Sequence, residues 1–116
     1  MTVPTLRHRN HILLTFFLLA GLALVFRVAR ADDASAKLFQ TKCVACHAAD
    51  GSGNTTVGKT LKLRDLRDPD IQKQSDAELT EIIVKGKDKM PAYEKTLKPD
   101  QIKGLVAYIR TLAEKK

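Results

Sequence analysis

The stretch Cys43-Val44-Ala45-Cys46-His47 determines how the rest of the chain is interpreted. Its two cysteines are three positions apart, so in a helix both thiols lie on one face, about one turn apart. The histidine that follows supplies an imidazole nitrogen, a common metal ligand. Cys-x-x-Cys-His is the attachment signature of a c-type haem, in which each thiol adds to a vinyl group of the porphyrin and the histidine ligates the iron.

Other chemistries of these residues fit the chain less well. A structural zinc site needs four ligands, but the chain has only two cysteines, and its other histidines, His8 and His11, lie near the N-terminus. A thioredoxin-like pair is expected beside a βαβ pattern, which the sequence lacks, and a disulfide would close a very small, strained loop. We therefore predict one haem c, attached through Cys43 and Cys46, with His47 as an axial ligand of its iron.

The N-terminal segment has the three features of a secretory signal peptide. Residues 1–10 are polar and basic, residues 12–26 are almost entirely apolar, and Ala29-Arg30-Ala31 is a small-residue cleavage site. As an uncleaved helix the apolar run would be about 22 Å long, short of the roughly 30 Å hydrocarbon core of a bilayer. We predict a signal peptide at 1–31 and a periplasmic or otherwise exported domain at 32–116, tethered to the membrane only if the signal is not removed.

Cleavage after Ala31 leaves 85 residues, enough for one small domain, which at this size commonly depends on a cofactor or cross-link. The whole chain has a formal net charge of +7, but four of its basic residues belong to the predicted signal. The remaining 16 basic and 13 acidic residues give +3, and no nucleic-acid-binding motif is visible. We predict no nucleic-acid partner, and nothing in the sequence requires more than a monomer.

The exported domain is predicted to be all-α, because no strand alternation is visible. Residues 34–42 carry apolar side chains on a face that leads into Cys43. Ser75-Asp76-Ala77-Glu78 is a capping box for a second helix, which Gly86 would end. Residues 48–74, between these helices, are expected to be mostly loop. A third helix is expected from Pro99, because apolar residues follow at helical spacing. These residues are Ile102, Leu105, Val106 and Ile109.

The second axial ligand follows by elimination. Met90 is the only methionine besides Met1, and His47 is the only histidine of the exported domain. Pro91 favours an extended or turn conformation at Met90, so its thioether would project from a loop. An unusual lysine ligand and a purely packing role for Met90 are the alternatives. We predict that Met90 is the sixth ligand of the iron.

Residues 53–60 also match the phosphate-binding pattern G-x-x-x-x-G-K-[ST]. That loop needs a buried strand before it and a helix after it. Residues 48–52 do not have a strand pattern, and the charged residues after Thr60 show no amphipathic face. We interpret the match as accidental and predict no nucleotide binding.

Together these motifs resemble the small monohaem class I cytochromes c, over residues 33–112. The resemblance rests on the haem signature, Asp50-Gly51 after it, Ile83-x-x-Gly86-Lys87 before Met90-Pro91-Ala92-Tyr93, and Leu105-x-x-Tyr108 in the last helix. It implies the class I cytochrome c fold, with three to four short helices wrapped around one covalently attached haem. It also implies that Phe39 packs against Leu105 and Tyr108 where the first and last helices cross.

The chain departs from this family in the loop after the haem signature. Many relatives have a proline there, whose carbonyl accepts the ring N–H of the axial histidine, but residues 55–59 contain none. We expect another backbone carbonyl, such as that of Thr56, to take this role. The chain also lacks the tryptophan that would bind a haem propionate, which leaves Lys62, Arg64 or Tyr93 as candidates.

The resemblance implies a periplasmic electron carrier and not an enzyme. Two alternatives are an electron-transfer subunit of a larger oxidoreductase, and a five-coordinate haem enzyme or gas sensor, which a Met90 ligand disfavours. Redox proteins are the expected partners, acidic at their docking face if lysines near the haem steer them. A solvated lysine-rich surface without that role is the alternative. The lysines are Lys42, Lys59, Lys62, Lys85, Lys87, Lys89 and Lys95.

Overall fold

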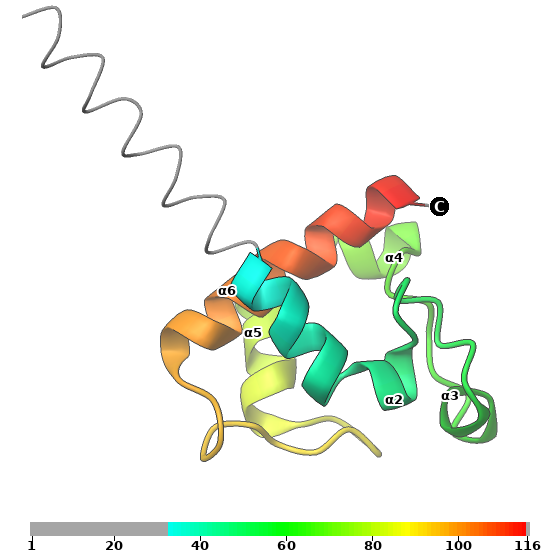
Figure 1. The fold of residues 1–116 in the computed structure, drawn as a ribbon, viewed down its shortest axis with the longest axis horizontal. Helices are drawn as coiled ribbons and strands as arrows, with labels where there is room; N and C mark the ends of the chain where they lie inside the picture. Colours follow the sequence, from blue (N-terminus) through cyan, green and yellow to red (C-terminus); the bar gives the residue numbers. More distant parts are fainter. Residues whose placement is uncertain (1–32, 116) are drawn as a thin grey trace, which may run out of the picture. The chain divides into compact units, whose positions relative to one another are not determined.

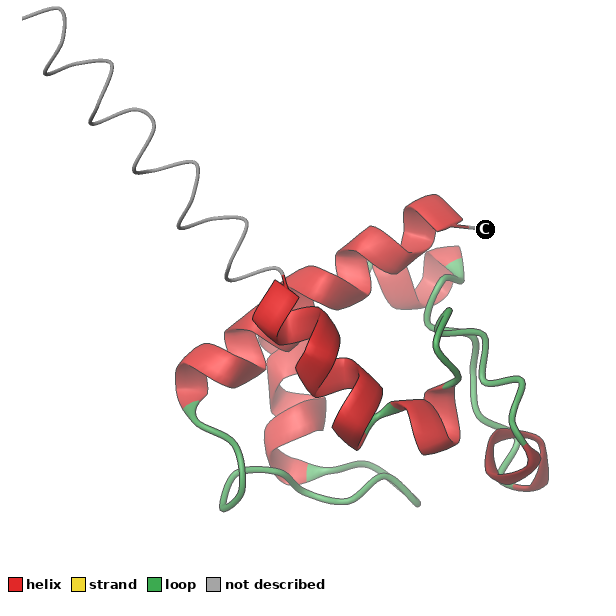
Figure 2. Ribbon diagram, in the orientation of Figure 1, coloured by secondary structure: helices red, strands yellow, loops and turns green. Residues whose placement is uncertain are grey.

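The structure, a computed structural model, describes residues 33–115, and these residues form helices and loops without a strand (Figures 1 and 2). The all-α prediction is confirmed. The predicted signal peptide lies outside the described residues, and within them no helix is both long and apolar enough to cross a membrane. Residues 33–42 are helical. The later helices are α2 (Val44–His47), α3 (Thr56–Thr60), α4 (Pro69–Gln72), α5 (Asp76–Lys85), α6 (Pro99–Leu112) and the short 3-10 helix η1 (Ala113–Lys115).

The 33–42 helix crosses α6 (Figure 1). At the crossing the rings of Phe39 and Tyr108 lie 5.2 Å apart, centroid to centroid, and are tilted by 50°. Gly104 lies opposite Ser35, and a Cβ at this position would displace the Ser35 hydroxyl. Phe39 is 1% exposed and belongs to the same buried core as Leu105. The predicted packing of the first helix on the last is confirmed.

Helix α5 begins and ends where the sequence predicts. The Ser75 hydroxyl accepts a hydrogen bond from the Glu78 amide (3.2 Å), and the Glu78 carboxylate accepts one from the Ser75 amide (2.6 Å), which forms the capping box. Arg110 of α6 donates to the carbonyls of Gln72 and Gln74, just before this cap. The buried face of α5 adds Leu79 and Ile83 to the core. The remaining buried apolar residues are Ile71, Leu97, Ile102, Val106, Ile109 and Leu112.

Residues 48–74, between α2 and α5, are more structured than the sequence predicts. They contain two helices of about one turn, α3 and α4. The Thr55 hydroxyl caps α3 by accepting from the Gly58 amide (2.8 Å), and Pro69 starts α4. Helices this short have no room for an apolar period, so only their caps could have indicated them. No strand precedes α3 in residues 33–55, which agrees with treating the phosphate-loop match as accidental.

Replacing Phe39 by alanine is expected to lower the free energy of unfolding by about 3–5 kcal/mol, the usual cost of removing a buried phenylalanine. Denaturant unfolding of the haem-loaded protein measures this. Val57→Ala is the control, because Val57 is 42% exposed and should change stability by less than about 0.5 kcal/mol. Equal effects of the two substitutions would contradict the central role given to the helix crossing.

Candidate functional site

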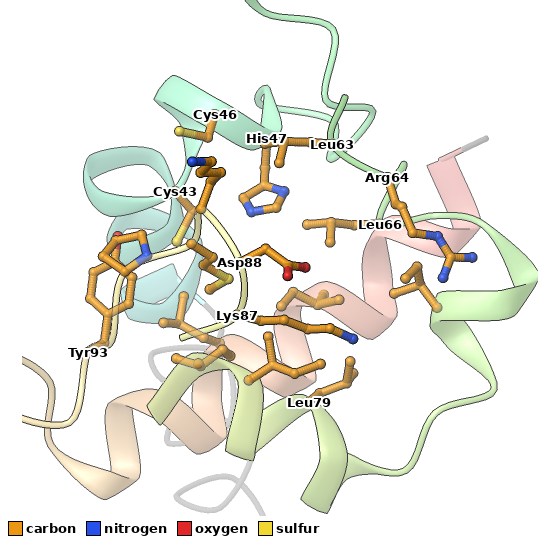
Figure 3. A pocket seen from close by; sticks show the side chains of 18 of the residues that line it. Cys43, Cys46, His47, Leu63, Arg64, Leu66, Leu79, Lys87, Asp88 and Tyr93 are labelled. Carbon is orange, nitrogen blue, oxygen red and sulfur yellow. The ribbon is translucent and has the colours of Figure 1, made fainter. Parts of the chain in front are cut away.

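All four residues predicted to bind the haem, Cys43, Cys46, His47 and Met90, line one cavity of about 290 Å³. The first three come from the α2 segment, and Met90 comes from the loop after α5, which we call the Met90 loop (residues 86–98). Figure 3 shows the imidazole of His47 turned into this cavity. Most of the lining is apolar. It includes Phe39, Leu61, Leu63, Leu66, Ile71, Leu79, Ile82, Ile83, Pro91, Leu97, Leu105 and Ile109.

The haem signature continues the 33–42 helix after an irregular residue. The Cys43 amide donates to the Phe39 carbonyl (2.9 Å), and the His47 amide donates to the Cys43 carbonyl (2.9 Å). The thiols of Cys43 and Cys46 therefore leave one short helical segment, as the spacing predicts. The two sulfurs form no disulfide.

Burial shifts the pKa values of Cys43 and His47. It raises the pKa of the Cys43 thiol to about 11, with a smaller contribution from Cys46. Burial also lowers the pKa of His47 below its ordinary value, because a buried imidazolium loses its hydration. His47 is therefore neutral at pH 7, which is the form that ligates a metal ion.

The predicted hydrogen bond between the His47 ring and the Thr56 carbonyl is absent. His47 Nδ1 is buried and has no hydrogen-bond partner among residues 33–115, whereas the Thr56 carbonyl accepts from the Thr60 hydroxyl (2.9 Å) inside α3. The loop holds the main chain of this segment instead. The Thr55 hydroxyl donates to the Cys46 carbonyl (3.0 Å), and the Gly53 amide donates to the His47 carbonyl (2.8 Å).

The Met90 loop turns sharply after α5. Gly86 ends that helix with φ +74° and ψ +169°, a combination that is essentially restricted to glycine. A Cβ at Gly86 would lie 2.5 Å from the Met90 carbonyl oxygen and 2.9 Å from the Ala92 amide. Lys87 and Met90 exchange backbone hydrogen bonds of 2.8 and 3.2 Å. Met90 lies in a loop, as predicted, and its half-buried side chain lines the cavity and packs against the core.

Cationic side chains gather among the residues that line the cavity. Five of the lining residues are lysine or arginine, and one, Asp88, is acidic. Figure 3 shows Arg64 and Lys87 at this site. This excess of positive charge suits an apolar group that carries carboxylates. The cations are Lys42, Lys62, Arg64, Lys87 and Lys89.

These residues fit a haem: two sulfurs and an imidazole from one segment, a thioether from another, an apolar cavity, and cations for its propionates. Within residues 33–115 no three His, Cys, Asp or Glu side chains come together as ligands for a lone metal ion. Sequence reasoning missed the apolar wall from Leu61 to Ile71 and the acidic Asp88. Clustered leucines at 61, 63 and 66 were the available signal.

Comparisons with known proteins identify the family. Residues 30–109 match the model for "Cytochrome C oxidase, cbb3-type, subunit III". The chain is 36% identical over 74 residues to cytochrome c6 of Nostoc sp. (strain PCC 7120), a match that covers 64% of each protein. It is 35% identical over 82 residues to cytochrome c6 of Leptolyngbya boryana, which covers 71% of this chain and 93% of that protein. The chain is a monohaem c-type cytochrome.

Two further matches agree with this family. The solved structure of the KustC0563 c-type cytochrome is similar with a TM-score of 0.63 and 32% identity, over 67% of this chain and 95% of that one. The cbb3-type cytochrome c oxidase subunit FixP of Bradyrhizobium sp. (strain ORS 278) is 40% identical over 81 residues, but that match spans only 27% of FixP. As a cytochrome c6-like electron carrier with haem c as its cofactor, the chain is not an enzyme.

Replacing Gly86 by alanine is expected to destabilise the cytochrome by about 1–3 kcal/mol, because the backbone conformation excludes a side chain. The added Cβ would also push the Met90 carbonyl away. Denaturant unfolding of the haem-loaded protein measures the change, with the exposed Lys89→Ala in the same loop as the control. Unchanged stability in Gly86→Ala would show that the turn after α5 relaxes freely.

Proposed function

We propose that this cytochrome is an exported one-electron carrier whose haem is bonded through Cys43 and Cys46 and ligated by His47 and Met90. The observation that carries the proposal is that these four side chains, from two segments far apart in sequence, line the same apolar cavity. The haem supplies a reversible one-electron change of its iron. The chain contributes the attachment, the two axial ligands and the exclusion of water.

Each part of the cavity has a role in this proposal. Ligation by His47 and Met90 would favour the reduced iron and so raise the reduction potential of the haem. The half-buried side chains of Leu63 and Leu66, with the more exposed Leu61, would cover part of the haem and limit the reorganisation that accompanies a change of charge. Lys62 and Arg64, both among the lining residues, are the candidates to bind the propionates.

Five of the seven lysines predicted to steer a partner fall into two groups, whereas Lys59 and Lys95 are not among the cavity-lining residues. Lys42, Lys62, Lys87 and Lys89 line the cavity, whereas Lys85 is paired with Glu81 at 2.7 Å. We propose that the first group attracts an acidic redox partner toward the haem. Paired lysines such as Lys85 add less to that long-range field, because their charge is largely cancelled nearby.

The predicted signal peptide agrees with this assignment. Covalent haem attachment is expected outside the cytoplasm, and residues 1–31 have the pattern of a cleaved signal peptide. We therefore propose that residues 32–116 function in the periplasm as a monomer. N-terminal sequencing of the purified cytochrome would support cleavage if it began at Asp32, and an intact Met1 would indicate a membrane tether instead.

A second candidate is an electron-transfer subunit of a larger oxidoreductase. The match to the cbb3-type subunit III model and to FixP favours it. Gel filtration of a native extract distinguishes the two functions. A free carrier elutes near the size of this small chain, and a subunit elutes with the complex.

The visible spectrum of the exported cytochrome tests the axial ligands. We expect a low-spin spectrum with a far-red sulfur-to-iron band in the wild type, and loss of that band in both Met90→Ala and Met90→Leu. The leucine variant keeps the apolar volume and so controls for packing. A high-spin, carbon monoxide-responsive wild type with no change on substitution would favour the five-coordinate alternative.

Replacing Lys87 and Lys89 by glutamine is expected to slow reduction by an acidic partner about two- to ten-fold at low salt, because the attractive field is weakened. The difference should shrink as ionic strength rises. Stopped-flow rates at several salt concentrations measure this. Lys37→Gln with Lys103→Gln is the control of equal charge change, at lysines that do not line the cavity. Equal slowing by both pairs would indicate that only net charge matters.

A further inference from the structure

We propose that Tyr93 is a positioning residue, which holds the Met90 loop against the haem-attachment segment through a hydrogen bond from its phenol to the Lys42 carbonyl. The inference rests on the proposed ligation by Met90. Its consequence is that Tyr93 resists movement of the Met90 thioether away from the iron and restricts the entry of external ligands.

The hydrogen bond joins the two walls of the cavity. The Tyr93 hydroxyl donates to the carbonyl of Lys42 over 3.1 Å, although the two residues are 51 positions apart. Lys42 ends the 33–42 helix and directly precedes Cys43. Figure 3 shows the Tyr93 ring on the same side of the cavity as Cys43. The phenol therefore connects the loop that carries Met90 to the residue directly before the haem signature.

The main chain of Tyr93 is hydrogen-bonded to α5. Its amide donates to the Ile83 carbonyl in α5 (3.0 Å), and its carbonyl accepts from the amides of Thr96 and Leu97 (3.0 and 2.9 Å). The next residue, Glu94, donates to the Val84 carbonyl (3.2 Å). The Tyr93 backbone is thus held by α5 and its phenol by Lys42. The residue therefore fixes the Met90 loop relative to both elements.

The hydroxyl of Tyr93 remains a hydrogen-bond donor at neutral pH. Burial raises its pKa above the ordinary value for tyrosine, so the hydroxyl keeps the proton that it donates at neutral pH. Its acceptor is a backbone carbonyl, whose position depends on the helix and not on a flexible side chain. The ring itself lines the cavity, so a phenylalanine at this position preserves the packing and removes only the hydrogen bond.

The test is the binding of imidazole to the oxidised haem-loaded protein, because this ligand binds iron only after the Met90 sulfur has moved away. We expect Tyr93→Phe to raise the apparent imidazole affinity about three- to ten-fold, in line with the loss of one hydrogen bond that keeps the loop closed. The far-red sulfur-to-iron band should persist without imidazole but disappear at a lower temperature. Tyr108→Phe removes the chain's other phenol and is the matched control, expected to bind imidazole as the wild type does.

The outcomes separate this inference from the ligand assignment. If the wild type lacks the far-red band, or if Met90→Ala retains it, the proposed ligation by Met90 fails. If that band depends on Met90 but Tyr93→Phe and wild type bind imidazole equally, the role of Tyr93 is overturned. Equal gains in affinity for Tyr93→Phe and Tyr108→Phe would also overturn it, because they would reflect a general loss of stability.

Discussion

The packing of Phe39 on Tyr108 places the first wall of the haem site. Phe39 is buried at the helix crossing, and its carbonyl accepts the amide of Cys43. The same residue thus belongs to the core and to the cavity lining. The position of both cysteines and of His47 depends on this contact, because α2 begins directly after Cys43. It depends also on the loop hydrogen bonds to the Cys46 and His47 carbonyls.

The second wall of the haem site consists of α5 and the Met90 loop. It is positioned against α6, the helix that carries Tyr108. Arg110 of α6 donates to the carbonyls of Gln72 and Gln74 and pairs with Asp76 at 2.7 Å, which fixes the start of α5. At the other end of α5, Gly86 turns the chain into the Met90 loop. Helix α6 therefore supports both walls, and the distance between the haem signature and Met90 depends on how the 33–42 helix and α5 pack on it.

The sequence predicted the parts of the fold that have local signals. The Ser75 capping box, the Gly86 stop and the periodic apolar face from Ile102 to Ile109 each leave a pattern within one helix. The short helices α3 and α4 leave only the cap residue Thr55 and the first-turn Pro69. The segment from Leu61 to Ile71 becomes a cavity wall only through tertiary packing. The environment of His47 Nδ1 was also beyond prediction, because which carbonyl meets a ring nitrogen depends on loop geometry at the level of an ångström.

The apolar lining of the cavity explains why a small domain depends on its cofactor. Without an occupant these apolar side chains would face water, and burying apolar surface contributes about 25 cal/mol per Å². The total stability of a typical domain is only about 5–15 kcal/mol. A haem bound between the haem signature and the Met90 loop would bury this surface. Covalent attachment of the haem, which we propose at Cys43 and Cys46, would therefore stabilise the fold as well as retain the redox group, since the apolar surface of the haem would complete the core.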